Sequence, residues 1–269
     1  MTIFKAVTVA GSDTSGGAGL QADLKTFQEL GVYGMTAITV IVAQNPRDNW
    51  SHVVYPLPIE VLDAQLETIL AGIGVDALKT GMLATAEVIA LVAEKIAQYQ
   101  VKNVVIDPVL VCKGTDEVLH PESAVAIREK LAPLATIITP NIFEAKQLSG
   151  MSTINTLDDV KEAARAIYAL GPKNVLIKGG AKLQTPTAVD VLYDGRDFTI
   201  LESAKIDTKY THGAGCTYGA AVTAGLAKGL SVNEAVQQAK NFITAAIRQS
   251  FPLNAYVGPT WHAAHRSDG

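Results

Sequence analysis

Short apolar runs alternate along this chain with segments of helical periodicity, and this alternation limits the possible folds more than any other feature. The runs are typical of buried strands and cover residues 6–10, 36–43, 75–79, 104–106, 136–138 and 174–177. Strands that alternate with helices form a mostly parallel sheet with helices on both faces. Two later runs, 189–193 and 198–201, flank Asp194 and Gly195, a pair typical of a hairpin turn. We therefore predict an α/β fold with one three-layer α/β/α domain over residues 1–269 and an irregular tail from residue 251.

Two connections between the predicted elements are long. Residues 46–58 hold a polar loop, an alternating segment and a Pro-Leu-Pro break, and we expect an excursion from the sheet there. Residues 109–120 join a strand to the helix expected at 121–132. Connections of this length in α/β domains are often lids, so we expect a lid over residues 109–120.

Composition and charge exclude several classes of protein. The net charge is -4 and no basic run is present, whereas nucleic-acid binding needs clustered lysine and arginine. The apolar runs are too short to cross a bilayer and the N-terminus lacks a signal-peptide pattern, so we expect no membrane partner and a cytoplasmic location. Two cysteines in a chain of this length do not indicate a disulfide framework. Neither lies at the close spacing from a histidine that is typical of a zinc site. Small molecules are therefore the expected partners.

A glycine loop at residues 211–217, Thr-His-Gly-Ala-Gly-Cys-Thr, precedes a run of small residues that is typical of a helix. The small residues let backbone N–H groups converge on one point, and a helix N-terminus favours an anion such as phosphate. The same field favours a thiolate at Cys216 and acts to lower its pKa, whereas a bound phosphate would act to raise it, so the net direction stays open. The alternative is that Gly213 and Gly215 are ordinary turn glycines and that Cys216 is a small buried hydrophobe.

A second glycine loop, residues 11–19, follows the first predicted strand. It contains a formal match to the dinucleotide-binding fingerprint at 17–22. The match lies too far beyond the end of the strand for the tight turn of that motif, and the next strand ends in Gln44 and Asn45 without a ribose-binding acid. A Rossmann dehydrogenase is therefore not favoured.

Residues that are mostly polar or glycine gather at the carboxyl ends of the predicted strands, where open parallel sheets bind their ligands. These positions are Gly11, Asp13, Gln44, Met82, Asp107, Asn141, Lys178 and the loop 211–216. Lys178 offers a charge for phosphate groups, and Asp107 with Glu144 suits the water shell of Mg²⁺. A capping box is the structural alternative for Asn141 and Glu144. The set suggests phosphoryl transfer, without the motifs of P-loop enzymes or protein kinases.

The chain resembles the ribokinase-like kinases and, within them, the branch of hydroxymethylpyrimidine kinases and bacterial pyridoxal kinases. The motifs that carry the resemblance span essentially the whole chain and lie at 11–23, 79–82, 107–109, 139–144, 178–180 and 211–217. The resemblance implies a ribokinase-like fold, ATP and Mg²⁺ as cofactors, and a homodimer. It also makes Cys216 the catalytic base, at the position where most ribokinase-like enzymes carry aspartate.

The resemblance further implies which residues meet each ligand. The implied substrate pocket consists of Gly11, Asp23, Gln44, Met82 and Val109. The implied contacts of the ATP phosphates and the metal are Asp107, Asn141, Glu144, Lys178, Thr211, His212, Gly213, Ala214, Gly215 and Cys216. Within this set, Asp107 and Glu144 would hold the metal through water. Lys113 would meet the ATP phosphates as well.

Two residues favour different substrates, and both substrates are heterocycles with a hydroxymethyl group to be phosphorylated. Cys112 resembles the lid cysteine that faces the substrate aldehyde in the dual-cysteine pyridoxal kinases. Gln44 resembles the residue with which pyrimidine kinases read the amino edge of their substrate, which suits a carboxamide. We expect pyridoxal, and also pyridoxine and pyridoxamine, as substrates; the alternative is hydroxymethylpyrimidine or dual specificity. In the simpler explanations, Cys112 is a buried hydrophobe and Gln44 positions a loop.

Two other classes of protein fit less well. A sugar or nucleoside kinase of the same superfamily would carry aspartate instead of Cys216. A catalytically silent nucleotide-binding regulator would have no reason to keep Asn141, Glu144, Lys178 and Cys216 together.

Overall fold

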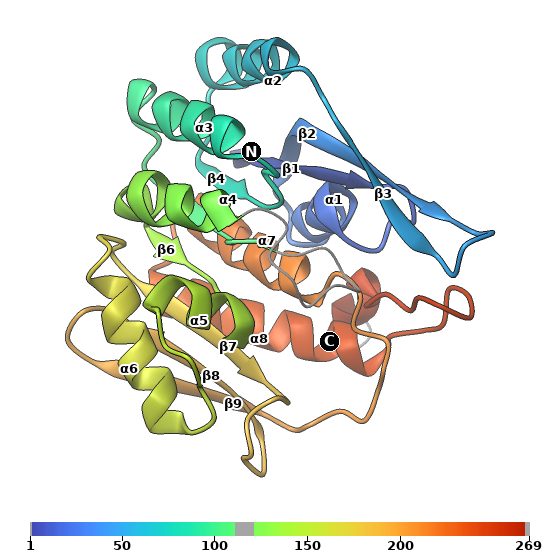
Figure 1. The fold of residues 1–269 in the computed structure, drawn as a ribbon, viewed down its shortest axis with the longest axis vertical. Helices are drawn as coiled ribbons and strands as arrows, with labels where there is room; N and C mark the ends of the chain where they lie inside the picture. The colour runs from blue at the N-terminus through green and yellow to red at the C-terminus, as the bar shows by residue number, and fades with distance from the viewer. Residues whose placement is uncertain (1, 111–120, 267–269) are drawn as a thin grey trace.

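The computed structural model of this chain describes residues 2–110 and 121–266 (Figure 1). Within these residues, nine strands form one sheet in the order β3-β2-β1-β4-β5-β6-β7-β8-β9. Their bounds are β1 Lys5–Asp13, β2 Tyr33–Asn45, β3 Ser51–Pro56, β4 Ala77–Thr80, β5 Val104–Ile106, β6 Ile137–Ile138, β7 Val175–Gly180, β8 Ala188–Tyr193 and β9 Phe198–Ser203. Neighbouring strands pair in parallel along the central series β2-β1-β4-β5-β6-β7. At the two edges of the sheet, β3, β8 and β9 add antiparallel pairs.

Helices cover both faces of the sheet, as Figure 1 shows. One face packs against α1 Gly19–Glu29, α7 Ala214–Ala227 and α8 Val232–Arg248. The other packs against α2 Ile59–Glu67, α3 Ala86–Gln98, α4 Pro121–Ala126, α5 Ile142–Ser149 and α6 Leu157–Tyr168. π-helical turns extend α2 over Thr68–Ile73 and α4 over Ile127–Leu131, and short 3₁₀ helices lie at Ala132–Leu134 and His262–Arg266. The predicted three-layer α/β/α class is therefore confirmed.

Alternation along the central strands explains why both faces need a helical layer. Val104 and Ile106 belong to the apolar cluster formed with α2 to α6, whereas Val105 belongs to the cluster formed with α7 and α8. All three side chains are fully buried. A strand that is apolar on both faces is stable only between two layers, so the continuous apolar runs of the sequence encode the architecture.

One part of the predicted path is wrong. We expected an excursion from the sheet over residues 46–58, but residues 51–56 form the edge strand β3, which pairs with β2 from Asn45 opposite Ser51 to Val40 opposite Pro56. Figure 1 shows this hairpin extending beyond the helical layers. Because most β3 side chains are partly or fully exposed, the segment lacks the apolar run by which the buried strands are predicted.

The parallel arrangement brings the carboxyl ends of distant strands to one edge of the sheet. Gly11, Met82 and Asp107 lie at the ends of β1, β4 and β5 or just after them, and Lys178 lies in β7. No helix in the described part of the chain has the length and apolarity needed to cross a membrane.

Candidate active site

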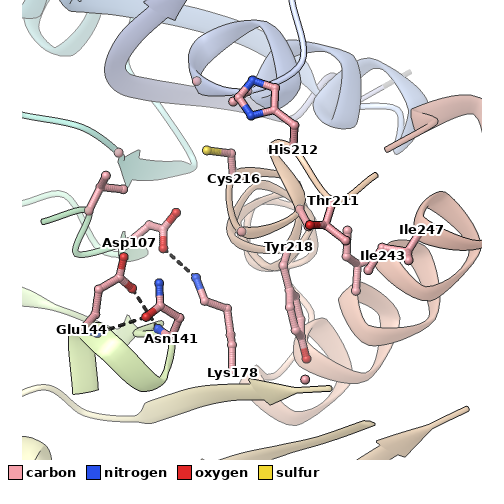
Figure 2. A pocket seen from close by; sticks show the side chains of 18 of the residues that line it. Asp107, Asn141, Glu144, Lys178, Thr211, His212, Cys216, Tyr218, Ile243 and Ile247 are labelled. Carbon is pink, nitrogen blue, oxygen red and sulfur yellow. Dashed lines mark hydrogen bonds and ion pairs between the residues drawn. The ribbon is translucent and has the colours of Figure 1, made fainter. Parts of the chain in front are cut away.

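A cavity of about 630 Å³ opens at this edge of the sheet, between the carboxyl ends of the strands and the start of α7 (Figure 2). Its lining includes most of the residues predicted to form a site: Gly11, Gln44, Met82, Asp107, Val109, Asn141, Glu144, Lys178, Thr211, His212, Gly213, Ala214, Gly215 and Cys216. Two predicted residues, Cys112 and Lys113, lie outside the described residues, as does most of the expected lid.

Asp23 does not line the cavity as the implied substrate contact would require. Its side chain is completely buried, where the hydroxyl of Thr8 donates to its Oδ2 at 2.6 Å. The ammonium of Lys79 lies 3.1 Å from the same oxygen. Asp23 is therefore placed as the partner of a buried lysine.

Lys79 is a site residue that the sequence analysis missed. It borders the cavity, and its ammonium lies 3.1 Å from Asp23 and 3.9 Å from Asp107. Burial favours the neutral amine, but these two carboxylates outweigh it and raise the pKa of Lys79, so the ammonium persists. Gly219 of α7 makes room for it, since a Cβ there would lie 2.9 Å from Cε of Lys79. Two signals were available, namely a lysine at the end of a buried strand and its place in the 79–82 motif that carries the family resemblance.

Asp107, just after β5, and Lys178, in β7, are charged residues that line the cavity. The ammonium of Lys178 donates to Oδ1 of Asp107 at 2.8 Å, and the Thr139 hydroxyl donates to the same oxygen at 3.3 Å. Burial works against the Lys178 charge, but Asp107 and Glu144 outweigh it and raise the pKa of Lys178. Lys178 is thus a persistent cation in the cavity wall, suited to an anionic ligand.

Asn141 and Glu144 form the capping box of α5, so the structural alternative for this pair is present. The Glu144 carboxylate accepts the Asn141 N–H at 2.8 Å, and the Asn141 side chain accepts the Glu144 N–H at 3.0 Å. Both residues also border the cavity. Burial, opposed by Lys178 and reinforced by Asp107, raises the pKa of Glu144 to about 7.

The donor set suits a Mg²⁺ ion that is held through water. Within residues 2–110 and 121–266, no three His, Cys, Asp or Glu side chains form a metal cage. Mg²⁺ usually keeps several waters and takes one or two carboxylates together with substrate phosphates. Asp107 is already compensated by lysine ammonium groups, whereas Glu144 is a buried carboxylate whose ionised form an added cation would stabilise.

The loop before α7 turns on Gly213, which is the N-cap of the helix in a left-handed conformation, with φ at 76°. A Cβ at this position would lie 1.8 Å from the carbonyl oxygen of Gly17, so only glycine fits. The Thr217 N–H donates to the Gly213 carbonyl at 2.9 Å. The first-turn N–H groups point along the helix axis toward the cavity end of α7, as expected of an anion-binding loop.

Cys216 lies in the first turn of α7 and borders the cavity. The sequence leaves the net direction of its pKa open, and in the structure desolvation raises the pKa of the thiol to about 12 against the effect of the helix terminus. The charge of Lys79 and a hydrogen bond from the Gly19 backbone favour the thiolate, but Asp23 and Asp107 add to the effect of burial. A helix terminus provides roughly half a charge, which cannot outweigh desolvation together with two carboxylates.

His212 connects the two glycine loops. Its Nε2 lies 2.7 Å from Oδ2 of Asp13, a carboxylate that also accepts the Ser15 hydroxyl and, at 2.7 Å, the Gln44 amide. Burial would raise the pKa of Asp13, but these partners, above all His212, lower it well below its usual range. Gln44 thus has the contact that a loop-positioning amide requires.

An apolar wall forms the far side of the cavity, and the sequence analysis did not find it. Ile206 before the glycine loop and Ile243 and Ile247 of α8 line this wall, and Figure 2 shows the two α8 side chains near Thr211. Lys240 and Asp190 also line the cavity and form an ion pair of 2.7 Å. Isoleucines four residues apart on a helix are typical of core positions. The sequence therefore gives no signal that separates cavity-lining isoleucines from those that pack in the core.

Known proteins are similar to this chain over almost its whole length. The family described as Phosphomethylpyrimidine kinase matches residues 13–261. Pyridoxine kinase of Bacillus subtilis is 64% identical over 266 residues, which cover 99% of this chain and 98% of the relative. The hydroxymethylpyrimidine/phosphomethylpyrimidine kinase of the same organism is 45% identical, with 99% of this chain and 97% of the relative covered.

Solved structures agree with the sequence relatives. The crystal structure of an ADP complex of Bacillus subtilis pyridoxal kinase superimposes with a TM-score of 0.96 at 64% identity and covers 98% of this chain and 99% of that one. Pyridoxal kinase from Staphylococcus aureus in complex with pyridoxal has a TM-score of 0.93 at 48% identity, with 98% and 95% covered. The chain thus has the predicted ribokinase-like architecture and belongs to the phosphomethylpyrimidine kinase family.

Proposed function

We propose that this protein is a pyridoxal kinase, which transfers the γ-phosphoryl group of ATP to the hydroxymethyl oxygen of pyridoxal and yields pyridoxal 5′-phosphate. Pyridoxine and pyridoxamine carry the same hydroxymethyl group and are included as substrates. The observation that carries the proposal is the 64% identity to a pyridoxine kinase, because it extends over 99% of the chain and so includes the whole cavity.

The two sides of the cavity suit the two substrates. We assign the side with Asp107, Lys178 and the α7 loop to the ATP phosphates, because it combines a persistent cation with a helix N-terminus. The apolar wall at Ile243 and Ile247 suits the base of the nucleotide. The opposite side, which includes Gly11, Gln44, Met82 and Val109, is assigned to the vitamin ring.

Phosphoryl transfer needs positioning and charge stabilisation more than covalent help from the protein. Lys178 and the first-turn N–H groups of α7 would stabilise the charge that develops on the transferred phosphoryl group. Mg²⁺, held by Glu144 and Asp107 through water, would neutralise phosphate charge when bound. The cavity walls would also exclude water that competes for the phosphoryl group.

Cys216 is the group that we assign as the base for the substrate hydroxyl. Its raised pKa means that the resting site holds a thiol, so base catalysis requires a lower pKa once both substrates are bound. Among the residues that the structure describes, Lys79 and Lys178 have ammonium groups that interact electrostatically with Cys216 and favour its thiolate. Their buried charges are therefore part of the proposed mechanism.

The alternative substrate is hydroxymethylpyrimidine, which is favoured by Gln44 and by the 45% identity to a hydroxymethylpyrimidine/phosphomethylpyrimidine kinase. Because the Gln44 Nε2 already donates to Asp13, its Oε1 would accept a hydrogen bond from the substrate amino group. The hypothesis that Cys112 adds to the aldehyde of pyridoxal concerns a residue outside the described part of the chain and stays a prediction.

Steady-state rates with pyridoxal, pyridoxine and hydroxymethylpyrimidine decide between these substrates. We expect kcat/KM for pyridoxal to exceed that for hydroxymethylpyrimidine by at least about tenfold, which corresponds to about 1.4 kcal/mol of differential binding. The reverse order would establish the alternative. A Cys112→Ala variant should lose activity toward pyridoxal but not toward pyridoxine, which lacks the aldehyde.

The homodimer, the cytoplasmic location and the single-domain organisation stay proposals that follow from the resemblance and the sequence. Light scattering measured as the protein elutes from a size-exclusion column is expected to give twice the mass of one chain. A single cooperative unfolding transition at constant oligomeric state is expected for one domain.

A further inference from the structure

The segment from Gly258 to His262, near the C-terminus, lies against the glycine loop that opens α7. The His212 N–H donates to the Gly258 carbonyl at 3.0 Å, and the Thr260 N–H donates to the His212 carbonyl at 3.4 Å. These bonds form a short parallel bridge between His212 and Pro259. A segment more distant in sequence, residues 258–262, therefore supports the loop that we assign to the ATP phosphates.

The same segment reaches α7 through a buried contact between two side chains. Nε2 of His262 and Oγ1 of Thr217 are hydrogen-bonded at 3.0 Å, and Oγ1 of Thr260 lies 3.5 Å from the Thr217 hydroxyl. Thr217 is completely buried and His262 is 5% exposed. Burial and the charge of Lys25 lower the pKa of His262 to about 4, so the ring is neutral near pH 7 and the contact is a hydrogen bond between uncharged groups.

Thr217 occupies a sensitive position in the proposed site. It follows Cys216, and its N–H donates to the carbonyl of Gly213, the residue on which the loop turns. A threonine hydroxyl inside a helix commonly bonds the carbonyl four residues earlier, and such back-bonding bends helices. For Thr217 that carbonyl is the one of Gly213. When the proton of the neutral ring is on Nδ1, Nε2 accepts from the Thr217 hydroxyl, and this bond gives the hydroxyl an acceptor other than the Gly213 carbonyl.

The C-terminal segment is itself anchored to two other helices. The Trp261 N–H donates to the Ala246 carbonyl of α8 at 3.0 Å. The Arg266 guanidinium makes two bonds to the Glu29 carboxylate of α1, at 2.6 and 2.8 Å. His262 thus presents its ring to Thr217 from a segment whose adjacent residue, Trp261, is bonded to the backbone of α8.

We propose that His262 is a positioning residue for phosphoryl transfer. Through Thr217, it holds the first turn of α7 in the geometry that places Cys216 and the loop N–H groups at the cavity. This inference rests on the proposed function, since the positioned groups are those assigned to the transfer step. Small misplacements of such groups reduce the rate strongly while ground-state binding changes little.

A double-mutant cycle on this contact tests the inference. Thr217→Val keeps the shape of the side chain and removes the hydroxyl, and His262→Phe keeps a ring and removes the nitrogen. We expect each variant to lower kcat about tenfold with the KM for ATP within about twofold, and the double variant to be no slower than either single one. His262→Gln, which returns a polar atom near the position of Nε2, should regain most of the rate.

A matched control separates positioning from general loosening of the C-terminal segment. Arg266→Ala removes the anchor on α1, and its exposed side chain is outside the site, so kcat should stay within about twofold of the wild-type value. The proposal would be overturned if the loss of kcat in the double variant equalled the product of the two single losses. It would also be overturned if kcat were unchanged in both single variants. A loss in Arg266→Ala as large as that in His262→Phe would overturn it as well.

A second measurement does not depend on activity and remains informative if His262→Phe fails to fold. The rate of alkylation of Cys216, followed by peptide mass spectrometry at fixed pH, reports the surroundings of its thiol. In Thr217→Val we expect the alkylation rate of Cys216 to change by more than about threefold. In His262→Gln we expect it to change by less than about twofold. An unchanged rate in Thr217→Val refutes the positioning role. If the wild-type protein phosphorylates no substrate, the proposed function fails, whereas this labelling still tests the contact.

Discussion

The ammonium of Lys79 and the carboxylate of Asp23 form an ion pair 3.1 Å long in which neither side chain is exposed to solvent. The same ammonium lies 3.9 Å from Asp107, whose other oxygen accepts from Lys178 at 2.8 Å. Charges of alternating sign thus extend beneath the cavity from α1 to β7. Each carboxylate in this row is compensated, which is the condition under which buried charges are tolerated.

The first prediction concerns the stability of this pair. Lys79→Met should destabilise the protein by roughly 3–5 kcal/mol, because it leaves Asp23 buried without a cation. The double variant Lys79→Met/Asp23→Asn should recover much of the loss, since the uncompensated charge is then absent. Urea unfolding at pH 7 measures both effects. A Lys79→Met variant that loses less than about 1 kcal/mol would show that Asp23 is not charged in the folded protein.

The second prediction concerns Cys216. Cys216→Ala should lower kcat by about 10²–10⁴-fold, the usual contribution of a general base, while the affinity for ADP measured by calorimetry stays close to that of the wild-type protein. Cys216→Asp should be more active than Cys216→Ala, because it restores a carboxylate where related kinases carry one. A Cys216→Ala variant that keeps more than about half of the wild-type rate would remove this thiol from the mechanism.

The third prediction separates the structural and functional glycines of the α7 loop. Gly213→Ala should lower both Tm and activity, because its Cβ would overlap the Gly17 carbonyl and its φ of 76° is strained for alanine. Gly215→Ala should fold normally, since its Cβ would meet only the Lys178 ammonium, at 3.6 Å. It should still lose activity, because the methyl group enters the side assigned to phosphate. Equal Tm values for both variants would contradict this distinction.

The fourth prediction is a pH dependence of stability that comes from His262. The pKa of His262 is about 4 in the folded protein against 6.5 for the free side chain, so the unfolded chain binds more protons between these values. Stability should therefore fall as the pH decreases from about 6.5 to 4, by on the order of 3 kcal/mol.

His262→Gln is the matched comparison for this titration. The difference in unfolding free energy between the two proteins, measured in urea from pH 7 to pH 4, isolates the contribution of His262. Glu144 has a raised pKa of about 7 and acts in the opposite direction, but it is present in both proteins and cancels. A difference that does not change with pH would mean that the folded protein accommodates a charged ring at this position.

The fold was largely predictable because its central strands are apolar on both faces. Val104 to Ile106 show this pattern, and so do Ile137 and Ile138 of β6 and residues 175–177 of β7. The edge strand β3 was not predictable in the same way, since its exposed side chains and terminal proline produce no apolar run. Burial patterns identify elements inside a sheet better than elements at its border.

The candidate site was predictable where one principle applied, namely the convergence of strand ends at one edge. Asp107, Lys178 and the Gly213 loop were found in this way. Lys79 was not, because the partner that allows a lysine to be buried, Asp23, lies on another element and becomes visible only in three dimensions. The net direction of the Cys216 pKa could not be predicted for the same reason, since a helix terminus is local whereas desolvation depends on all the surrounding chain.

The product of the reaction is the most direct test of the proposed function. Purified protein incubated with pyridoxal, ATP and Mg²⁺ should form pyridoxal 5′-phosphate and ADP in equal amounts. Phosphorus NMR should place the new ester on the hydroxymethyl oxygen, and chelation of Mg²⁺ should stop the reaction. Release of ADP without this ester, or phosphorylation of a sugar or of hydroxymethylpyrimidine with pyridoxal left unchanged, would contradict the assignment.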